Sequence, residues 1–246
     1  MAPYDFRSPR LFVEAALTSG ARLTLDATRT NYLVNVLRLK GGATILVFNG
    51  RDGEWLGRLA GAGKRVELGI DHQVRTQSPP GDLHYLFSPL KRARLDYMVQ
   101  KAVEMGVSRL QPVMTRRTQA ERVNLDRMHA NAIEAAEQCG ILSLPEIAVP
   151  LSLADAISAW QSERHLVFCD EAADVADPLA ALATVPRGAP LAVLIGPEGG
   201  FAADERAALL KLPHVVRLAL GPRILRADTA AVAALALVQS VIGDWR

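Results

Sequence analysis

Residues 191–201 read Leu-Ala-Val-Leu-Ile-Gly-Pro-Glu-Gly-Gly-Phe, and this stretch decides the fold class. Five consecutive apolar residues predict a strand that is buried on both faces, as in a parallel sheet. The strand leads directly into a glycine-rich loop, and residues 203–211 then have the pattern of a helix. Ligands of open α/β sheets bind beyond the carboxyl ends of such strands. The loop is therefore a candidate ligand site, although a tight strand-to-helix turn explains the same glycines.

A second loop of this kind covers residues 218–229, Leu-Ala-Leu-Gly-Pro-Arg-Ile-Leu-Arg-Ala-Asp-Thr. Another apolar strand, at 215–218, is followed by Gly-Pro, by Arg223 and Arg226, and then by Asp228 or Thr229 as the cap of an alanine-rich helix over 229–242. Guanidinium groups suit RNA phosphates, carboxylates and base edges. Ion pairs with the acidic second half of the chain are the alternative. Neither loop has the GxGxxG or P-loop pattern, so the ligand need not be a phosphate.

The rest of residues 83–242 alternates between strands and helices, which predicts an α/β fold with a parallel sheet covered on both faces. We expect strands at 83–88, 110–114 and 166–169, and helices at 92–105, 124–139 and 153–160. The helix at 92–105 has an apolar stripe, formed by Leu95, Met98, Val99, Ala102 and Val103.

Residues 1–75 have a different pattern, with short strands expected at 11–13, 21–25, 43–48, 54–60 and 65–70. One helix is expected at 27–39, with Asp26 as its cap, Gly41-Gly42 as its end, and Leu33, Val36 and Leu37 on its apolar face. Residues 76–82, Thr-Gln-Ser-Pro-Pro-Gly-Asp, read as a linker. We therefore expect two domains, at 1–75 and 76–246.

Composition and charge narrow the class of protein. Half of the 246 residues are hydrophobic and 22% are charged, as in a globular protein with a core. No apolar run is long enough to cross a bilayer and the N-terminus has no signal-peptide pattern, so we expect a cytoplasmic protein. Scattered histidines and two cysteines give no metal motif. Residues 1–130 contain 20 Lys and Arg against 12 Asp and Glu, which favours a polyanion-binding first half.

The two loops together resemble the RsmE family of SPOUT methyltransferases. Gly-Pro-Glu-Gly-Gly at 196–200 is followed about twenty residues later by Leu-Gly-Pro-Arg-Ile-Leu-Arg at 220–226. Residues 31–42, 99–107, and 136–140 together with 145–147 also match family segments, so the resemblance extends from about Arg10 to Asp244. Two positions depart from the family pattern. Asp228 replaces the usual Glu, and Ile141 replaces the usual Arg after Cys-Gly.

This resemblance implies more than the residue pattern does. It implies an N-terminal PUA-like RNA-binding β-barrel and a SPOUT-type parallel sheet whose C-terminal chain forms a deep trefoil knot. It also implies a homodimer that binds S-adenosylmethionine, needs no metal, and methylates N3 of one uridine in the decoding region of bacterial 16S rRNA, within the small ribosomal subunit.

The expected site residues fall into three groups. For the cofactor they are Leu194, Ile195, Gly196, Pro197, Gly199, Gly200, Leu218, Leu220, Gly221, Ile224 and Leu225. For catalysis we expect Arg226 as the cation near the uridine oxygens, and Asp228 or Glu198 to orient it or to accept the proton. For RNA binding we expect Arg10, Arg38, Lys40, Lys91, Arg92, Arg94 and Arg223.

Three alternatives stay open at this point. Arg226 could serve only to brace the knot, and residues 91–94 could be an ordinary solvated helix start. The protein could be a ribose 2′-O or tRNA methyltransferase of the same superfamily, or an RNA-binding assembly protein without catalytic activity. The smooth alanine surface of the last helix favours a dimer interface, with burial inside one chain as the alternative.

Overall fold

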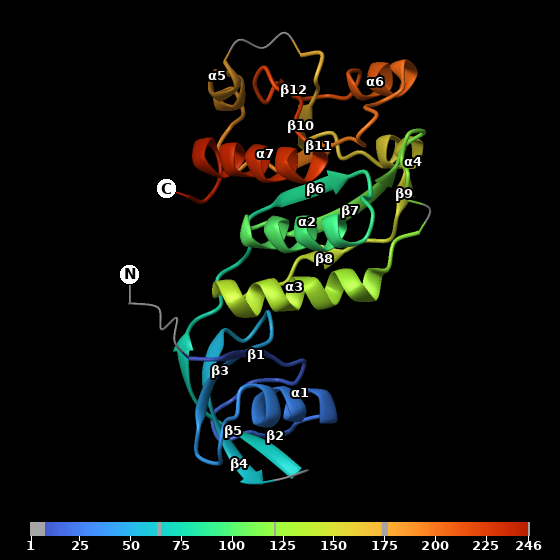
Figure 1. Ribbon diagram of the computed structural model, residues 1–246. Helices are drawn as coiled ribbons and strands as arrows, with labels where there is room; N and C mark the ends of the chain where they lie inside the picture. The colour runs from blue at the N-terminus through green and yellow to red at the C-terminus, as the bar shows by residue number, and fades with distance from the viewer. Residues whose placement is uncertain (1–7, 63–64, 121, 174–176, 246) are drawn as a thin grey trace. The chain divides into compact units, whose positions relative to one another are not determined.

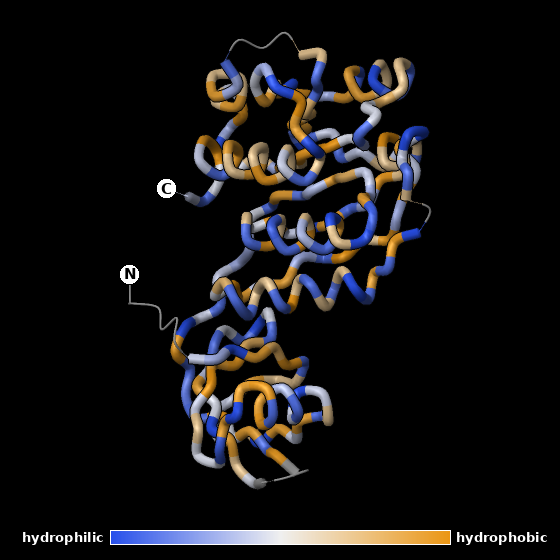
Figure 2. Tube along the Cα trace, viewed as in Figure 1, coloured by the Kyte–Doolittle hydropathy of each residue, from blue (hydrophilic) through white to orange (hydrophobic). Residues whose placement is uncertain are grey.

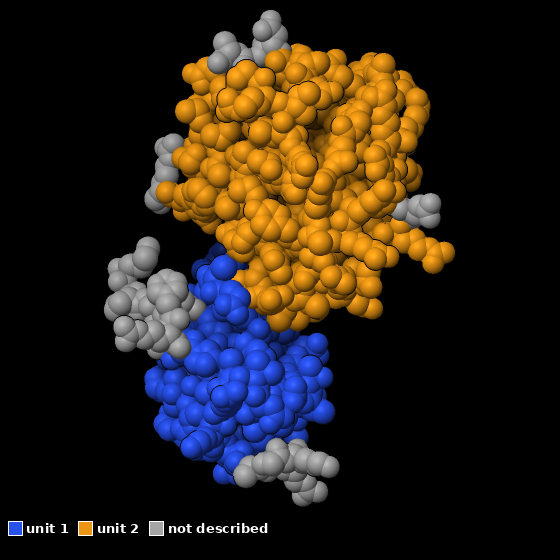
Figure 3. Space-filling model, viewed as in Figure 1, with its two compact units in different colours: residues 1–79, 136–144 blue, residues 80–135, 145–246 orange. Residues whose placement is uncertain are grey.

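The computed structural model describes residues 8–62, 65–120, 122–173 and 177–245, and the chain forms two compact units (Figure 3). Unit 1 comprises residues 1–79 together with 136–144, and unit 2 comprises 80–135 together with 145–246. The first division between the units falls inside the segment 76–82. The grouping of residues 136–144 with the N-terminal unit was not expected from the sequence pattern.

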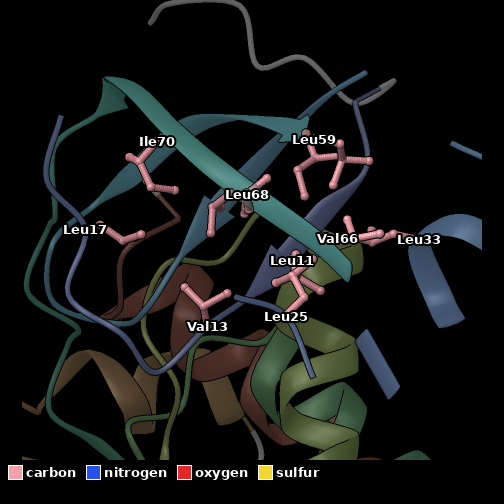
Figure 4. Packing of buried hydrophobic residues seen from close by; sticks show 11 residues of the cluster. Leu11, Val13, Leu17, Leu25, Leu33, Leu59, Val66, Leu68 and Ile70 are labelled. Carbon is pink, nitrogen blue, oxygen red and sulfur yellow. The ribbon is translucent and has the colours of Figure 1, made fainter. Parts of the chain in front are cut away.

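Unit 1 is built on a five-stranded sheet with the order β1-β3-β4-β5-β2 (Figure 1). Strand β1 pairs with β3 in parallel, and the other neighbours are antiparallel. The sheet contributes to a core in which Leu11, Leu33, Leu59 and Leu68 are buried (Figure 4). The strands are β1 (Arg10–Phe12), β2 (Arg22–Thr24), β3 (Thr44–Phe48), β4 (Glu54–Ala62) and β5 (Arg65–Arg75).

The helix expected at 27–39 is shorter and of mixed type. Asp26 caps α1 (Ala27–Asn31) as expected, accepting a hydrogen bond from the Arg29 amide at 2.7 Å. The next residues form a π-helical turn, η1 (Tyr32–Val36). The chain leaves the helix at Arg38, whose φ is +56°, so the expected end at Gly41-Gly42 is wrong. The wider π turn also rotates Val36 off the apolar face, and it is 62% exposed.

Unit 2 contains the parallel sheet that the sequence predicts. Its strand order is β12-β10-β11-β6-β7-β8, with β9 pairing with β7, and every pairing is parallel (Figure 1). Strand β11 is buried at all five positions. The strands are β6 (Leu83–Phe87), β7 (Arg109–Met114), β8 (Glu146–Ile147), β9 (Leu151–Ser152), β10 (His165–Cys169), β11 (Leu191–Ile195) and β12 (Val215–Leu218).

Five helices lie in the described part of unit 2, and a sixth, α3, begins there and ends with residues assigned to unit 1. The apolar stripe expected on α2 is buried at all five positions. Along α2 and α3 hydrophilic and hydrophobic positions alternate (Figure 2). Helices α4 and α6 contribute to one core cluster with β10 and β11, and α7 contacts α2, α5 and β11. The helices are α2 (Ala93–Glu104), α3 (Leu125–Cys139), α4 (Leu153–Ser158), α5 (Pro178–Ala183), α6 (Ala203–Leu209) and α7 (Ala227–Val241).

Two details of these helices differ from expectation. Helix α7 begins at Ala227, and Arg226 occupies its N-cap position without a side-chain hydrogen bond, so neither Asp228 nor Thr229 caps it. Helix α5 was not expected at all, although Asp177 caps it through bonds from the Leu179 and Ala180 amides. None of the helices among the described residues has both the length and the apolar character needed to cross a membrane.

Candidate functional site

A cavity of about 280 Å³ lies at the carboxyl ends of β10, β11 and β12. These three strands are neighbours in the order β12-β10-β11, so the loops that follow them meet at one edge of the sheet. Both loops that the sequence singled out contribute to the walls. Nine of the eleven expected cofactor residues line the cavity: Ile195, Gly196, Pro197, Gly200, Leu218, Leu220, Gly221, Ile224 and Leu225.

The remaining two expected cofactor residues do not line this cavity. Leu194 is 1% exposed and packs in the core cluster with Leu153 and Leu209, because side chains alternate between the two faces of a strand. Gly199 lies beside Arg117, whose guanidinium donates a 2.6 Å hydrogen bond to the Gly199 carbonyl. Gly199 therefore helps to position the loop rather than to form the wall.

A third loop, which the sequence analysis missed, completes the cavity. Cys169 ends β10, Asp170, Glu171 and Ala172 follow it, and all four line the cavity. The sequence pattern could have predicted this loop, because residues 165–171 read as an apolar strand that ends in two carboxylates. The rule that placed ligands beyond β11 and β12 applies equally to β10.

Two of the glycines that line the cavity, Gly196 and Gly221, occupy positions that a larger residue would strain. Gly221 has φ +93°, a conformation that L side chains rarely adopt. At Gly196 a Cβ atom would lie 2.5 Å from the Phe201 ring. At Gly196 the missing side chain lets the Phe201 ring pack against the backbone, and at Gly221 it leaves open space beside the backbone.

Asp170 anchors the third loop. Its side chain is 3% exposed and accepts hydrogen bonds from Arg206 at 2.8 Å, from Arg217 at 2.9 Å and from the Ala172 amide at 3.1 Å. Burial alone would raise the pKa of Asp170, but the bonds from Arg206, the Ala172 amide and Arg217 outweigh it and lower that pKa. The carboxylate thus stays charged and ties the loop to α6 and β12.

The glycine-rich loop is held in place by the residues that follow β7. Arg116 forms an ion pair with Asp204, and its amide donates a 2.9 Å hydrogen bond to Glu205. Glu205 also accepts from the Ala202 amide at 2.9 Å, at the start of α6. Together with the bond from Arg117 to Gly199, these contacts connect the loop after β7 to the loop after β11.

Of the three expected catalytic residues, Glu198 lines the cavity, whereas Arg226 and Asp228 are not among its lining residues. Glu198 forms an ion pair with Arg94. Arg226 is exposed and lies between the lining residues Leu225 and Ala227. Asp228 is half-buried in the first turn of α7 and accepts a 2.9 Å hydrogen bond from the Thr229 amide. Among the described residues neither carboxylate forms an ion pair with Arg226, so the expected orienting contact is not present.

One expected RNA contact is wrong. Arg10 is 5% exposed and forms an ion pair with Glu54 at 2.7 Å, so it is not available to a phosphate. It also donates to backbone carbonyls of residues 136–141, including Ile141 at 2.9 Å. Arg75 completes the cluster at 2.6 Å from Glu54. This buried cluster joins β1, β4 and β5 to residues 136–144 within unit 1.

The other expected RNA contacts are accessible. In unit 1, Arg38 and Lys40 are exposed. In unit 2, Lys91, Arg92 and Arg223 are exposed, whereas Arg94 is partly covered through its pair with Glu198. Arg223 lines the cavity and forms no ion pair with a described residue.

Comparison with known proteins agrees with this geometry. The family of the RNA methyltransferase domain matches residues 76–239, and the RNA methyltransferase PUA domain matches residues 25–70. A protein of Rickettsia conorii named Ribosomal RNA small subunit methyltransferase E is 27% identical, and the match covers 94% of each chain. The protein of that name from Buchnera aphidicola is 26% identical over 97% of this chain and 95% of the relative.

Two solved structures resemble the whole chain. The Ribosomal RNA small subunit methyltransferase E of Neisseria gonorrhoeae, bound to S-adenosyl methionine, has a TM-score of 0.87 and 27% identity over 98% of this chain and all of that one. A putative methyltransferase of Legionella pneumophila, in complex with the same cofactor, has a TM-score of 0.84 and 26% identity over 95% and 98% of the two chains. The chain belongs to the RNA methyltransferase family, and its relatives include the ribosomal RNA small subunit methyltransferase E proteins.

Proposed function

We propose that this protein is an S-adenosylmethionine-dependent methyltransferase that acts on N3 of a uridine in bacterial 16S rRNA. The cavity bounded by the loops after β10, β11 and β12 is the observation that carries the proposal. Two relatives of the same fold are described as bound to this cofactor. The names of the curated relatives support ribosomal RNA of the small subunit as the substrate.

The cavity has the chemistry that S-adenosylmethionine requires. Leu218, Leu220 and Leu225 supply apolar walls, and the backbone of Gly196 and Gly221 in the same wall supplies hydrogen-bonding groups. Glu171 places an exposed carboxylate at the rim, where it can accept hydrogen bonds from ribose hydroxyls. Ile224 lines the cavity but is 95% exposed, and we expect bound cofactor to cover part of it.

The residues around this cavity would serve the transfer as follows. The cofactor supplies the methyl group. N3 of uridine must lose its proton to become a good nucleophile, and the negative charge then spreads to the flanking carbonyl oxygens. Arg226, exposed beside the wall residue Leu225, would stabilise that charge. Glu198 or Asp228 would accept the proton, either directly or through water. Glu198 lines the cavity, which favours it of the two.

RNA binding would use both units. In unit 1, which contains the match to the PUA domain, Arg38 and Lys40 are accessible to phosphates. In unit 2, Lys91, Arg92 and Arg223 are accessible as well. Contacts of this kind release counterions, so RNA affinity should fall steeply with salt.

Three further features remain predictions. The trefoil knot formed by the two loops and the homodimer follow from the resemblance, and a cytoplasmic location follows from the sequence pattern. The helix expected at the dimer interface, α7, carries six alanines. Ala230, Ala231 and Ala234 are buried within unit 2, so part of the smooth surface serves packing inside one chain. Sedimentation at micromolar concentration distinguishes a dimer from a monomer, and a monomer there would refute the dimer.

The proposal is tested by incubating the protein with methyl-labelled S-adenosylmethionine and small ribosomal subunits from a strain that lacks the protein. We expect label in the small-subunit rRNA, recovered as 3-methyluridine after nuclease digestion and mass spectrometry. A 2′-O-methyl nucleoside, or transfer to tRNA instead, would replace the proposed reaction with another of the same superfamily. Cofactor binding without transfer to any RNA would refute the catalytic assignment.

A further inference from the structure

A second cavity adjoins the first one in unit 2. It has a volume of about 350 Å³ and lies between the loops that follow β6, β7 and β11. Because β6 and β7 continue the sheet beyond β11, these loops meet at the same carboxyl edge as the first cavity. Pro197 and Glu198 line both cavities. The lining residues are Pro89, Leu90, Lys91, Arg94, Gln119, Pro197 and Glu198.

The walls of the second cavity suit an anionic, hydrogen-bonding ligand. Lys91 and Arg94 supply positive charge, and the exposed side chain of Gln119 supplies both a donor and an acceptor. Arg94 is paired with Glu198 on the wall that the cavities share. The side chains of Lys91 and Gln119 have no hydrogen-bond partner among the described residues, so both are available to a ligand.

Hydrogen bonds fix the loops around this cavity before any ligand arrives. Ser88 donates its amide to the Ile195 carbonyl at 3.0 Å, and its hydroxyl lies 2.7 Å from that of Thr118. The Thr118 hydroxyl also accepts from the Thr115 amide at 2.8 Å. The loops after β6, β7 and β11 therefore form one connected wall, as expected of a largely preformed binding site.

A larger groove of about 710 Å³ continues from the second cavity, with Leu90, Lys91 and Gln119 lining both. Arg92, Arg122 and Arg127 add three positive charges along it. Of these, Arg127 is bonded to Asp96 at 2.6 Å, and Asp96 is the acidic residue among those that line the groove. The first cavity, the second cavity and the groove thus form a continuous series along the edge of the sheet.

We propose that the second cavity binds the nucleotide that is methylated, a single pyrimidine nucleotide turned out of the RNA strand. Lys91 and Arg94 would contact its phosphate and Gln119 the edge of its base, while the groove takes the adjoining phosphates. The inference rests on the proposed function. A methyl donor and its acceptor must be adjacent, and the shared wall at Pro197 and Glu198 makes these cavities adjacent. A base inside a helix is reached by turning it into such a pocket.

The test uses the full-length protein and three variants, Lys91→Ala, Gln119→Ala and the matched control Lys211→Ala. Lys211 is exposed in the same unit and lines none of the three spaces. We expect each of the first two changes to lower kcat/KM for small subunits by about 10- to 100-fold, the effect of losing one hydrogen bond to a charged or buried polar group. Cofactor Kd should not change. Lys211→Ala should behave as wild type.

Wild-type kcat/KM in both Lys91→Ala and Gln119→Ala would overturn the inference while leaving the methyltransferase assignment intact. A second measurement does not depend on methyl transfer. Small-subunit rRNA that contains 4-thiouridine is irradiated with the wild-type protein, and the crosslinked peptides are sequenced. Crosslinks within residues 88–94 or 115–120 support the site. Crosslinks confined to other segments overturn it, even when the protein transfers no methyl and the proposed function itself has failed.

Discussion

Replacing Asp170 should destabilise unit 2 and weaken cofactor binding together. The carboxylate is buried, and its three partners come from α6, β12 and its own loop. In Asp170→Ala all of these hydrogen bonds are lost, and the loop after β10 loses the contact that holds it against the cavity. Asp170→Asn keeps the shape and removes the charge, so we expect it to lie between wild type and Asp170→Ala.

The expected loss of unfolding free energy in Asp170→Ala can be estimated from the hydrogen bonds that the carboxylate accepts. Hydrogen bonds to a charged group, such as those that the Asp170 carboxylate accepts, each contribute about 1.5–3 kcal/mol. Arg206 and Arg217 are 33% and 32% exposed and regain water when the carboxylate is removed, so only the lower part of that range applies. We expect a loss of about 3 kcal/mol, which lowers the Tm of unit 2 by roughly 6–12 °C.

Scanning calorimetry measures the shift, and isothermal calorimetry measures the cofactor Kd in the same samples. Asp204→Ala is the matched control, because Asp204 forms an ion pair with Arg116 that is largely exposed; its Tm should change by less than about 2 °C. An Asp170→Ala protein whose Tm lies within about 2 °C of wild type would refute the anchoring role.

The pH dependence of the unfolding free energy provides an independent test of the role of the Asp170 carboxylate. The pKa of Asp170 is lower in the folded protein than its ordinary value, so its contribution is complete above a pH of about 4 and is lost as the pH falls through the lowered folded pKa. The difference in unfolding free energy between wild type and Asp170→Asn should therefore be constant near neutral pH and shrink only in acid. A difference that shrinks on raising the pH would contradict the argument.

Three further changes test other parts of the molecule. Gly221→Val forces a side chain into a φ of +93°, with open space around it, so the protein should fold while cofactor Kd rises about 10-fold or more; unchanged Kd in calorimetry would remove this loop from the site. Arg226→Ala should bind cofactor normally and transfer methyl about 100-fold more slowly in a single-turnover assay, whereas an unfolded variant would favour the bracing role. Glu54→Ala leaves Arg10 buried without its carboxylate, so the unfolding free energy of unit 1 in urea should fall by about 3–5 kcal/mol; a change below about 1 kcal/mol would contradict the buried cluster.

The sequence predicted the features that depend on local periodicity. The stripe on α2 and the apolar strand β11 could be read because their patterns repeat at 3.6 residues or run without interruption. The π turn at Tyr32–Val36 could not, because a single wider turn leaves the residue types unchanged. Helix α5 was missed although the sequence carries its start signals, Asp177 as the cap and Pro178 in the first turn.

In the candidate site, too, some features could be predicted from local sequence patterns and others could not. Glycine-rich loops next to apolar strands are visible in the sequence, and most of their residues line the cavity. The burial of Arg10 was invisible, because its partner Glu54 is 44 residues away and the carbonyls that it contacts are more than 120 residues away. The second cavity was equally hidden, since Lys91, Gln119 and Glu198 come together only through the strand order.

The central claim is that the cofactor binds in the first cavity with its methyl group toward the second. A crystal structure of the protein in complex with S-adenosylmethionine tests this claim most directly. We predict cofactor density in the cavity between the loops after β10, β11 and β12, against the backbone of Gly196 and Gly221, with the methyl group directed toward Pro197 and Glu198 and the second cavity beyond them. Density at another place, or a methyl group directed away from that shared wall, would contradict the account.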